Sequence, residues 1–463
     1  MKRHNISIKS GVCIHFIGIL GSGMKPLAGY AAALGCKVTG SDLNKNKGDL
    51  SDNIKTWDFH SREHLAGVDI AVYSSAIPTD HPEIMAAKNK GIPLLHRSEA
   101  ISILTRDHSG IFIAGSHGKT TTSAMLCHCL HHLKKDPKAI IGAKILSIDS
   151  DFLCGEGKDF VVEADESDGS FLNYSPSCAF VTNIDHDHLD FYGTLQGIEE
   201  AFGEFILNTA VDGSIVVGWD NKSVRNMITA NKEELSEKNI EIITYGKYIG
   251  CDNRILSIHK IPGGTKFECI LGKEIVAFSL PLMGNHNVDN ALSVISYLRV
   301  KNVSNEQIQS ALSTFKGVKR RLEVKEENSS RMIIDDYAHN PTKISSAIQA
   351  VKSHYENAHI SVIFQPHRYS RLSTMYDMFC KSFIDADTVI VTPIFSAGER
   401  CDKNLNHHKL AIDISSLSAV KAHSVDNYAS IKAVTDRETT PFNVILILGA
   451  GDTENIYNCI KDN

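Results

Sequence analysis

Residues 110–130 read GIFIAGSHGKTTTSAMLCHCL, and this stretch decides the fold. An apolar run leads into a glycine turn, a lysine, three threonines and a second apolar run that is long enough for a helix. A strand, a glycine turn and a helix in this order are typical of a phosphate-binding loop, because N–H groups at a helix start attract anions. The stretch departs from the common pattern G-x-x-x-x-G-K-[ST], since Ile113 stands where the first glycine is expected. We interpret this departure as a different entry into the loop and predict a nucleoside triphosphate site.

Different residues of this loop would bind the phosphates and the metal ion. Lys119 would supply a positive charge to the β- and γ-phosphates, and the hydroxyl of Thr120 would ligate Mg²⁺. The residues of the loop predicted to bind the nucleoside triphosphate are Gly115, Ser116, His117, Gly118, Lys119, Thr120 and Thr121. A chance G-K-T in an ordinary structural turn is the alternative interpretation.

The region before this loop alternates between strand-like and helix-like patterns. The predicted strands are CIHFIGI at 13–19, KVTGSD at 37–42, DIAVYSSAI at 69–77 and IPLLHRSE at 92–99. This alternation predicts a parallel sheet in a Rossmann-like domain. The turn GILGSGM at 18–24 would hold a diphosphate, with a ribose or phosphate at the end of the second strand. The residues concerned are Gly21, Gly23, Met24, Ser41 and Asp42. The alternative is a tight structural turn, and the pattern alone does not separate NAD from a nucleotide-sugar.

Two further units of the same kind follow. The second includes the predicted strands DFVVEADES, CAFVTNID, GSIVVGWD and FECILGKEIVAFSLP, and the third includes SRMIIDDYAHNP, HISVIFQPH, DTVIVTPIF and NVILILGAGD. We therefore predict an α/β protein of three domains. An N-terminal Rossmann-like domain at 1–107 precedes a central domain of P-loop ATPase type at 108–317 and a C-terminal Rossmann-like domain at 318–463.

Composition excludes several classes of protein. The chain has 463 residues, of which 42% are hydrophobic and 22% charged, and its net charge of −6 gives no indication of nucleic-acid binding. No apolar run reaches the length of a membrane span, and the apolar run near the N-terminus is interpreted as a strand rather than a signal peptide. The 11 cysteines are scattered without a C-x-x-C pair, so we expect a reducing cytoplasm. We expect a monomer or a weak homodimer.

Acidic residues and histidines follow two of the central strands. The first group is Glu163, Asp165, Glu166 and Asp168, and the second is Asp185, His186, Asp187, His188 and Asp190. Carboxylates are preferred ligands of hard cations such as Mg²⁺. Because parallel sheets gather their sites at the carboxyl ends of strands, we predict one shared site, although each group alone could be a surface loop.

Polar residues in the last third of the chain suggest further binding groups. Asn287 and Asn290 share one face of a predicted helix and would cap it or contact an adenine. The remaining groups, suited to carboxylate or phosphate recognition, are Lys319, Arg320 and Arg321; Asp335, Asp336 and His339; and His367, Arg368 and Arg371. A solvated basic face is the alternative for them. The histidines of CHCLHHLKK are expected to belong to a helix surface and core.

Taken in order, these motifs resemble the Mur ligases of peptidoglycan assembly. The resemblance rests on GSHGKTTT, EADESDGSF, TNIDHDHLD, GNHNVDNAL, GVKRRLE, DDYAHNPT and FQPHRYSR, and it extends over nearly the whole chain. GKTTT and the DH pair are shared by a wider superfamily that includes folylpolyglutamate synthases. EADESDGSF and FQPHRYSR are similar only to the members that add L-alanine. Those members also lack a lysine after the DH histidine, and HLDFYGTLQGIEEAFGEF likewise has none.

The resemblance implies an activity. An ATP-dependent ligase with Mg²⁺ would join L-alanine to the carboxylate of UDP-N-acetylmuramate through an acyl phosphate, and its dissected site would need domain closure. Lys119, Glu163 and His188 would act in catalysis, with Thr120, Glu163 and His188 on the metal. Asn287 and Asn290 would face adenine, and Arg321 and Asp336, one from each side of a domain junction, would close over ATP.

The remaining implied residues bind the other two substrates. The UDP-sugar would contact Gly21, Gly23, Met24, Ser41, Asp42, Ser74 and Ser75. The amino acid and the acyl phosphate would meet His339, His367, Arg368 and Arg371.

The chain also departs from the motifs of the L-alanine-adding members. Leu20 replaces a glycine of the first turn, Asn340 replaces a histidine and Lys343 an acid. These changes leave open a paralogous ligase with another acceptor. A recycling ligase that joins a peptide to the same sugar nucleotide is the nearest alternative, although Ser167 stands where that enzyme is expected to have tyrosine. A nucleotide-binding regulatory protein without turnover is the alternative from another class, and the retained Lys119, Glu163 and His188 argue against it.

Overall fold

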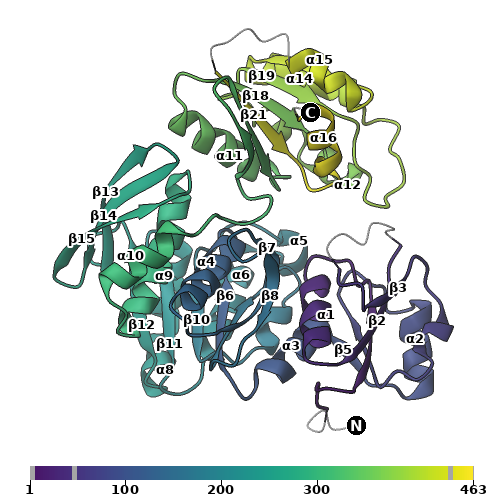
Figure 1. Ribbon diagram of the computed structural model, residues 1–463, viewed down its shortest axis with the longest axis vertical. Coiled ribbons are helices and arrows are strands. Elements are labelled where there is room, and N and C mark those ends of the chain that lie inside the picture. The colour runs from purple at the N-terminus through teal and green to yellow at the C-terminus, as the bar shows by residue number, and fades with distance from the viewer. Residues whose placement is uncertain (1–5, 44–49, 436–441, 462–463) are drawn as a thin grey trace. The chain divides into compact units, whose positions relative to one another are not determined.

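The computed structural model describes residues 6–43, 50–435 and 442–461, and the described chain forms three separate β-sheets with helices around them (Figure 1). The chain divides into two compact units. The first consists of residues 1–259, 266–281 and 286–316 and holds the first two sheets. The second consists of residues 260–265, 282–285 and 317–463 and holds the third. The prediction of a three-domain α/β fold is confirmed, whereas the domain boundaries at 107 and 317 stay predictions.

The N-terminal sheet has five parallel strands in the order β3-β2-β1-β4-β5. Its strands are β1 (Cys13–Ile17), β2 (Lys37–Ser41), β3 (Lys55–Trp57), β4 (Ile70–Tyr73) and β5 (Leu94–His96). Its helices are α1 (Met24–Ala33), η2 (Arg62–Leu65), α2 (Pro82–Lys90) and α3 (Arg97–Thr105). The predicted strands are therefore present but shorter than their apolar runs, because the last residues of each run already turn toward the next helix.

The central sheet has ten strands in the order β15-β14-β13-β12-β11-β10-β6-β9-β7-β8. These are β6 (Ser109–Ala114), β7 (Lys138–Ile145), β8 (Ser150–Cys154), β9 (Asp159–Glu163), β10 (Cys178–Val181), β11 (Ser214–Gly218), β12 (Glu241–Gly246), β13 (Asn253–Ile261), β14 (Gly264–Leu271) and β15 (Glu274–Leu280). Its helices are α4 (Lys119–His132), η3 (Ser170–Asn173), α5 (Leu189–Tyr192), α6 (Leu195–Leu207), α7 (Lys222–Ala230), α8 (Lys232–Glu237), α9 (Asn285–Val300) and α10 (Asn305–Ser313). The single strand predicted for FECILGKEIVAFSLP is wrong, since the chain turns at Gly272, with φ +64°, between β14 and β15.

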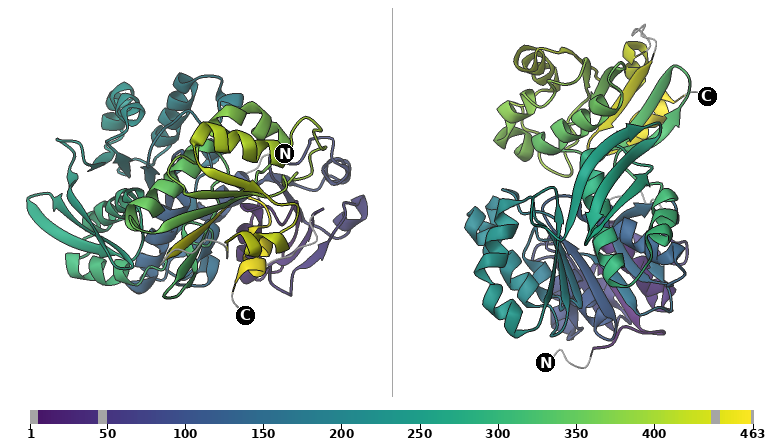
Figure 2. Two further views of the ribbon diagram at one scale, coloured as in Figure 1. Left: turned by 90° about the horizontal axis from the view of Figure 1, so that it is seen from above. Right: turned by 90° about the vertical axis from the view of Figure 1, so that its left-hand side faces the viewer.

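Helices cover both faces of the central sheet (Figure 2). On one face, Phe180 of β10 contacts Tyr297 of α9, with ring centroids 5.7 Å apart. On the other, Phe171 stacks on Phe205 of α6 with ring centroids 5.0 Å apart. Such double coverage explains why these strands read as continuous apolar runs rather than alternating ones.

The C-terminal sheet has six strands in the order β16-β17-β21-β18-β19-β20, and β16 alone of these pairs in antiparallel fashion. Its strands are β16 (Glu323–Glu327), β17 (Arg331–Asp336), β18 (His359–Phe364), β19 (Thr388–Val391), β20 (Lys421–Ser424) and β21 (Asn443–Leu448). Its helices are α11 (Pro341–His354), α12 (Tyr369–Thr374), α13 (Tyr376–Cys380), α14 (His407–Ser418), α15 (Ala429–Thr435) and α16 (Thr453–Ile460). Among the described helices of the whole chain, none has the length and apolar character that a membrane span requires.

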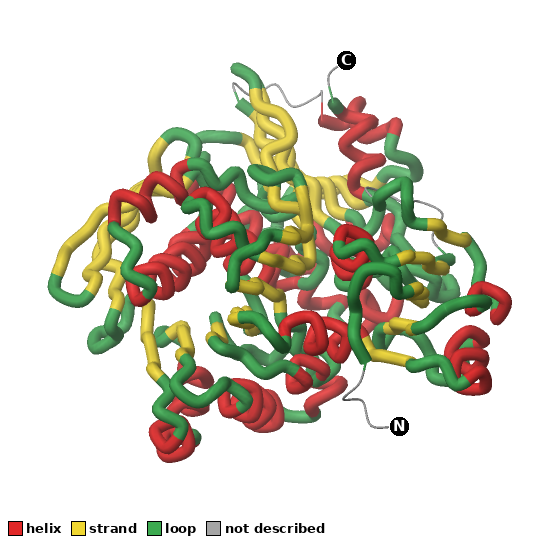
Figure 3. Tube along the Cα trace, turned by 60° about the horizontal axis from the view of Figure 1, so that its bottom comes forward, coloured by secondary structure: helices red, strands yellow, loops and turns green. Residues whose placement is uncertain are grey.

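The order of three central strands positions the candidate site. β6 lies between β10 and β9, and all three run parallel. Ala114 at the end of β6 is opposite Val181 of β10, and Ile113 is opposite Glu163 of β9. The three loops that leave these strands, drawn in green in Figure 3, therefore start at one edge of the sheet.

Removing an aromatic ring from the core beneath this edge should destabilise the first unit. Phe171 is fully buried between Phe202 and Phe205. We expect Phe171→Ala to lower the free energy of unfolding by about 3–5 kcal/mol, because the lost contacts leave a cavity. The matched control is Phe191→Ala, whose ring is 55% exposed and which should cost less than about 1 kcal/mol. Urea unfolding followed by circular dichroism checks this, and equal losses in both variants would contradict the packing described.

Candidate active site

The loop between β6 and α4 requires glycine at two positions. Gly115 has φ +135°, and a Cβ there would lie 2.1 Å from Thr182 Oγ1. Gly118 has φ +84°, and a Cβ there would lie 2.5 Å from Asn290 Oδ1. Backbone angle and space both exclude other side chains. Lys119 then begins α4, so the loop delivers this lysine to the first turn of a helix.

Two residues at the end of β10 hold this loop, and the sequence alone did not identify them. Asn183 accepts a hydrogen bond from the His117 N–H at 2.8 Å through Oδ1 and donates to the His117 carbonyl at 3.1 Å through Nδ2. Thr182 donates to the same carbonyl at 2.6 Å. The signal was available, because both follow a predicted strand adjacent to β6, where parallel strands gather polar residues.

Lys119 is held in a buried ion pair. Its Nζ donates to the Gly115 carbonyl at 2.6 Å and to Glu166 Oε1 at 2.8 Å. Burial alone would lower the pKa of Lys119, but the adjacent Glu166 carboxylate raises it above its usual value, so the ammonium stays charged. Glu166, expected among the metal ligands, is instead the counter-ion of this lysine, and its Oε2 has no hydrogen-bond partner among the described residues.

Oxygen donors meet beside this pair. The Thr120 hydroxyl donates to Glu163 Oε1 at 2.8 Å, and the Gly142 N–H donates to Glu163 Oε2 at 2.9 Å. His188, which has φ +56°, places Nε2 3.8 Å from Glu166 Oε1. A hydroxyl and a carboxylate in contact are the donors that Mg²⁺ prefers, and they lie at the helix start that carries Lys119.

The remaining loop residues are also accounted for. Ser116 is buried, and its Oγ accepts the N–H of Asp185 at 2.9 Å. His117 Nε2 lies 3.1 Å from Asp185 Oδ2, and this hydrogen bond is the first cause that lowers the pKa of Asp185 below its usual value. Thr121 is half-buried in the first turn of α4. Asp185 therefore stabilises the loop, and its carboxylate is already engaged with His117.

The helix α9 brings its two predicted asparagines to this loop. Both are buried, and Asn290 Nδ2 donates to Asn287 Oδ1 at 3.2 Å, so they share a face as the i, i+3 spacing predicts. Asn290 also lies against Gly118, as the blocked Cβ position there indicates. The pair therefore flanks the lysine-bearing helix start.

The first turn of the N-terminal sheet is fixed by Asp42. Its Oδ2 accepts the Leu20 N–H at 3.0 Å. Gly18 adopts φ +77°, whereas Leu20 is not among the described residues with positive φ, so leucine fits there without backbone strain. Gly21 is exposed before α1, while Met24, which begins α1, is buried.

The other predicted nucleotide-sugar residues have different surroundings. Ser41 is fully buried and donates to Glu83 Oε2 at 2.6 Å, so its hydroxyl faces the interior. The Ser74 carbonyl accepts the Ile77 N–H at 3.0 Å. Ser75 donates to Asp168 of the central loop.

Arg97 joins the N-terminal and central sheets, and the sequence alone did not identify it. Its guanidinium lies 3.5 Å from Asp165, and a Cβ at Gly23 would lie 1.8 Å from its Nη1. Burial lowers the pKa of Arg97, but neighbouring Tyr174 and Asp165 raise it above its usual value. Gly23 is therefore required for close approach of the arginine, and a fixed positive charge stands beside the first turn.

In the second unit, one prediction is corrected. Arg321 and Asp336 do not come from two sides of a domain junction, because both belong to the unit that includes residues 317–463. Asp336 is buried and accepts the N–H groups of Leu322 and Ala338, each at 2.8 Å. Burial raises its pKa above the usual value. Arg321 lies over the Tyr337 ring at 5.4 Å.

His339 and His367 of this unit are neutral near pH 7. Burial, and next the charge of Arg371, lower the pKa of His339 to about 3 and that of His367 to about 4. His339 donates through Nδ1 to the Tyr337 carbonyl at 2.7 Å, and Arg371 donates to His367 Nδ1 at 3.0 Å. Arg368 is exposed, with φ +68°. His339 Nε2 therefore keeps a lone pair, and His367 keeps its proton on Nε2.

Asn340, which stands where the motif of the L-alanine-adding members has histidine, is the N-cap of α11. Its side chain accepts the Lys343 N–H at 2.9 Å and caps α11, which continues with Pro341. Asparagine is among the preferred residues at this position of a helix.

The sequence of this chain is similar to known proteins along nearly its whole length. Family models described as "Mur ligase family, catalytic domain", "Mur ligase middle domain" and "Mur ligase, glutamate ligase domain" match residues 13–109, 113–298 and 320–451. The UDP-N-acetylmuramate–L-alanine ligase of Desulfosudis oleivorans is 36% identical over 449 residues, which is 96% of each chain. The chain belongs to the Mur ligase family.

Further comparisons extend to another sequence and to solved structures. The UDP-N-acetylmuramate–L-alanine ligase of Fusobacterium nucleatum is 38% identical over 98% of this chain and 97% of its own. The crystal structure of the UDP-N-acetylmuramate–alanine ligase of Thermotoga maritima superposes with a TM-score of 0.81 at 27% identity, covering 96% of this chain and 97% of that one. A murein peptide ligase of Psychrobacter arcticus, at 23% identity and a TM-score of 0.71, shares the Mur ligase fold over 97% of this chain and 98% of its own.

The bracing of the loop by Asn183 gives a testable consequence. We expect Asn183→Ala to weaken ATP binding roughly 10-fold, because two hydrogen bonds that shape the loop are lost, each contributing about 0.5–1.5 kcal/mol. Isothermal titration of full-length protein with ATP and Mg²⁺ measures this. The control is Asn239→Ala, which removes a bond to Asp212 on the surface. Unchanged affinity in Asn183→Ala would show that the loop keeps its shape without this brace.

Proposed function

We propose that this chain is an ATP-dependent ligase that joins L-alanine to the carboxylate of UDP-N-acetylmuramate in peptidoglycan precursor synthesis. The observation that carries the proposal is Lys119, delivered by a braced glycine loop to a helix start beside Thr120 and Glu163. The proposal is also supported by the similarity of the chain, over nearly its whole length, to relatives named as L-alanine-adding ligases. We further propose three domains with boundaries near residues 107 and 317, and action in the cytoplasm, where such a nucleotide-linked precursor is made.

The residues present fit Mg²⁺. Thr120 and Glu163 offer hard oxygen donors in direct contact, and His188 lies nearby, so we assign these three residues to the metal. When bound, the ion would neutralise phosphate charge.

The chain's own residues account for the positive charge that the first step needs. The carboxylate oxygen of the sugar nucleotide attacks the γ-phosphorus of ATP, the bond to ADP breaks, and an acyl phosphate results. Lys119 would turn from Glu166 toward the phosphates, while the first turn of α4 supplies N–H groups. Phosphoryl transfer depends on placement and charge neutralisation, which a charged lysine at a helix start provides.

The second step needs an amine nucleophile and a leaving phosphate. The amine of L-alanine attacks the acyl carbon, and phosphate departs from the tetrahedral intermediate. We assign this step to the cluster of the second unit, where the neutral His339 Nε2 can accept a hydrogen bond from the amine and the arginines can bind carboxylate or phosphate. The assigned residues are His339, His367, Arg368 and Arg371, with Arg321 and Asp336 over ATP.

The remaining substrate contacts follow the N-terminal turn and α9. We assign binding of the UDP-sugar to Gly21, Gly23, Met24, Asp42, Ser74 and Ser75. Ser41 would support this site indirectly, because its hydroxyl donates a hydrogen bond to Glu83. Asn287 and Asn290 would face adenine. Arg97 is a further candidate for the diphosphate, because its charge is fixed beside Gly23.

Loss of the loop lysine should abolish turnover. We expect Lys119→Ala to lower kcat at least about 10²–10³-fold, because a positive charge opposite the transferred phosphoryl group is removed. The control is Lys232→Ala at the exposed start of α8, which should leave the rate unchanged. Phosphate release from ATP measures both. Persisting activity in Lys119→Ala would remove this lysine from the phosphate site.

The assignment of Glu163 to the metal predicts a change in the dependence of activity on Mg²⁺. We expect Glu163→Ala to lose activity most strongly at limiting Mg²⁺, because one oxygen donor of the ion is gone while Thr120 remains. A matched change is Glu204→Ala on α6, outside the loops described. Initial rates across a Mg²⁺ titration separate the two. A loss that is the same at every Mg²⁺ concentration would exclude Glu163 from the metal.

The acceptor is tested by substrate dependence of phosphate release. With UDP-N-acetylmuramate present, release that requires L-alanine supports the proposal. Release with a tripeptide alone would move the assignment to a peptide-recycling ligase. No release with any amino acid or peptide would point to another acceptor.

A further inference from the structure

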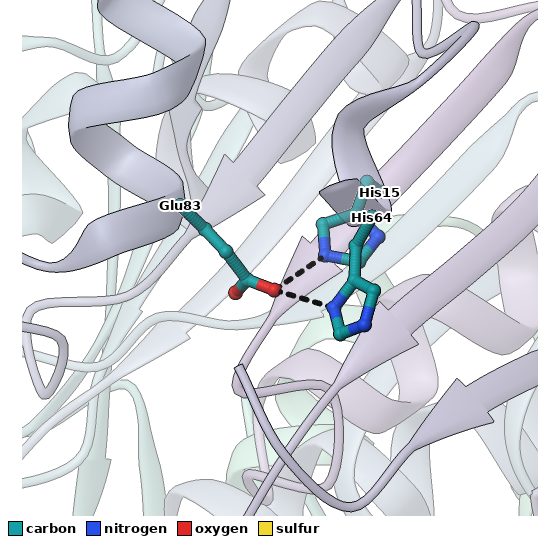
Figure 4. Close-up of side chains that lie close together, drawn as sticks. All are labelled: His15, His64 and Glu83. Atoms are coloured by element: carbon teal, nitrogen blue, oxygen red, sulfur yellow. Dashed lines mark hydrogen bonds and ion pairs between the residues drawn. The ribbon is translucent and has the colours of Figure 1, made fainter. Parts of the chain in front are cut away.

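A buried group of imidazoles and one carboxylate lies in the N-terminal sheet domain, apart from every residue assigned to the reaction except Ser41. Glu83 of α2 is fully buried, as is His15 of β1, and His64 of η2 is nearly so. His15 Nε2 lies 3.6 Å from Glu83 Oε1, and His64 Nδ1 lies 2.8 Å from the same oxygen. Figure 4 shows both rings directed at this oxygen from two different elements.

The carboxylate of Glu83 is engaged on both oxygens. It accepts hydrogen bonds from the Ser41 hydroxyl at 2.6 Å and from the Ser61 N–H at 3.2 Å, and His60 Nδ1 lies 3.1 Å from Oε2. Among the described ion pairs of Glu83, every partner is a histidine. A buried carboxylate surrounded by imidazoles is also a setting in which proteins hold a metal ion.

The three atoms have the spacing of metal ligands. Two ligands about 2.1 Å from a tetrahedral ion lie roughly 3.4 Å apart, and the distances of 3.6 and 2.8 Å bracket that value. One ligand atom from each of His15, His64 and Glu83 lies within 4.8 Å of the other two. His15 Nε2 is buried without a hydrogen-bond partner among the described residues, so its lone pair is available beside an anion.

The surroundings orient these rings as metal ligands are usually oriented. His15 Nδ1 lies 2.9 Å from Thr39 Oγ1, a contact that fixes the ring and leaves Nε2 toward Glu83. His64 is held flat against Trp57, with ring centroids 4.1 Å apart and planes 13° from parallel. His60 and Ser41 hold the second carboxylate oxygen, so Oε1 stays directed at the two rings.

We propose that His15 Nε2, His64 Nδ1 and Glu83 Oε1 bind a Zn²⁺ ion, with water at the fourth position. Two imidazoles and one carboxylate favour zinc over Mg²⁺ or Ca²⁺, which prefer oxygen ligands. The ion binds neutral imidazoles, so His64 carries its proton on Nε2. It connects β1, η2 and α2 behind the end of β2, where Ser41 and Asp42 lie, and thereby stabilises the turn proposed to bind the UDP-sugar.

Metal binding is measured directly on the full-length protein. Chelator-treated protein in saturating Mg²⁺, which occupies oxygen-rich sites, is titrated with Zn²⁺ against a chromophoric chelator. We expect one Zn²⁺ per chain. Titration with Co²⁺ should give the intense visible absorption of a tetrahedral ion, and Zn²⁺ should abolish it. Thermal unfolding should shift to higher temperature with Zn²⁺.

Variants locate the ion. His15→Gln and His64→Gln should each weaken Zn²⁺ binding by roughly 100-fold or more, and Thr39→Val should weaken it about 10–100-fold. The control is His408→Gln, in an exposed group with His407 and Asp426 that could also attract a metal. This change should leave the stoichiometry and affinity as they are. Circular dichroism at low temperature verifies that each variant is folded.

Trp57 gives a local readout. The chain has two tryptophans, so Trp219→Phe leaves Trp57 as the sole emitter. Co²⁺ should quench its fluorescence in this background, with the same midpoint as the absorption change, because Trp57 stacks on His64. Absence of stoichiometric Zn²⁺ binding would overturn the proposal. So would binding that His408→Gln removes, or binding that leaves Trp57 fluorescence unchanged.

Discussion

The parallel arrangement of β10, β6 and β9 is the constraint on which the rest of the candidate site depends. Because β6 lies between the other two, its glycine loop emerges between Asn183 on one side and Glu163 on the other. Side chains from three loops, separated by up to about seventy residues in sequence, thus meet because of the strand order alone. The apolar helices on both faces keep this register, since a strand covered on both sides cannot slip without exposing its core.

Close packing then makes the loop specific in sequence. Thr182 and Asn290 occupy the space where side chains at Gly115 and Gly118 would stand, so the loop is shaped by what surrounds it as much as by its own glycines. The same holds for Gly23, against which Arg97 lies. By contrast, Leu20 needs no special backbone, which explains how a glycine-rich turn accommodates leucine.

Much of the fold could be predicted from the sequence, since strand–turn–helix units have strong local patterns. Lys119, Thr120 and Glu163 could be proposed for the site from the sequence, because they stand at or just after the ends of predicted strands. Asn183 also follows a predicted strand, but its two hydrogen bonds to His117 appear only in the structure. Arg97 could not be predicted, because its importance lies in contacts with residues distant in sequence. The pairing of Glu166 with Lys119 was also missed, since a row of acids does not say which one is buried. The junction expected between Arg321 and Asp336 was wrong, because order along the chain does not reveal unit membership.

The Lys119–Glu166 pair has a consequence for selectivity. The ammonium of Lys119 is already paired with a buried carboxylate 2.8 Å away. An incoming anion therefore does not meet an unpaired ammonium and must displace Glu166 from it. Such an exchange favours a polyphosphate, which brings several charges and a metal with it, over a single inorganic phosphate that offers little more than the carboxylate it displaces. In the proposed phosphate site, Glu166 would therefore compete with the incoming anion and select among phosphates by their charge.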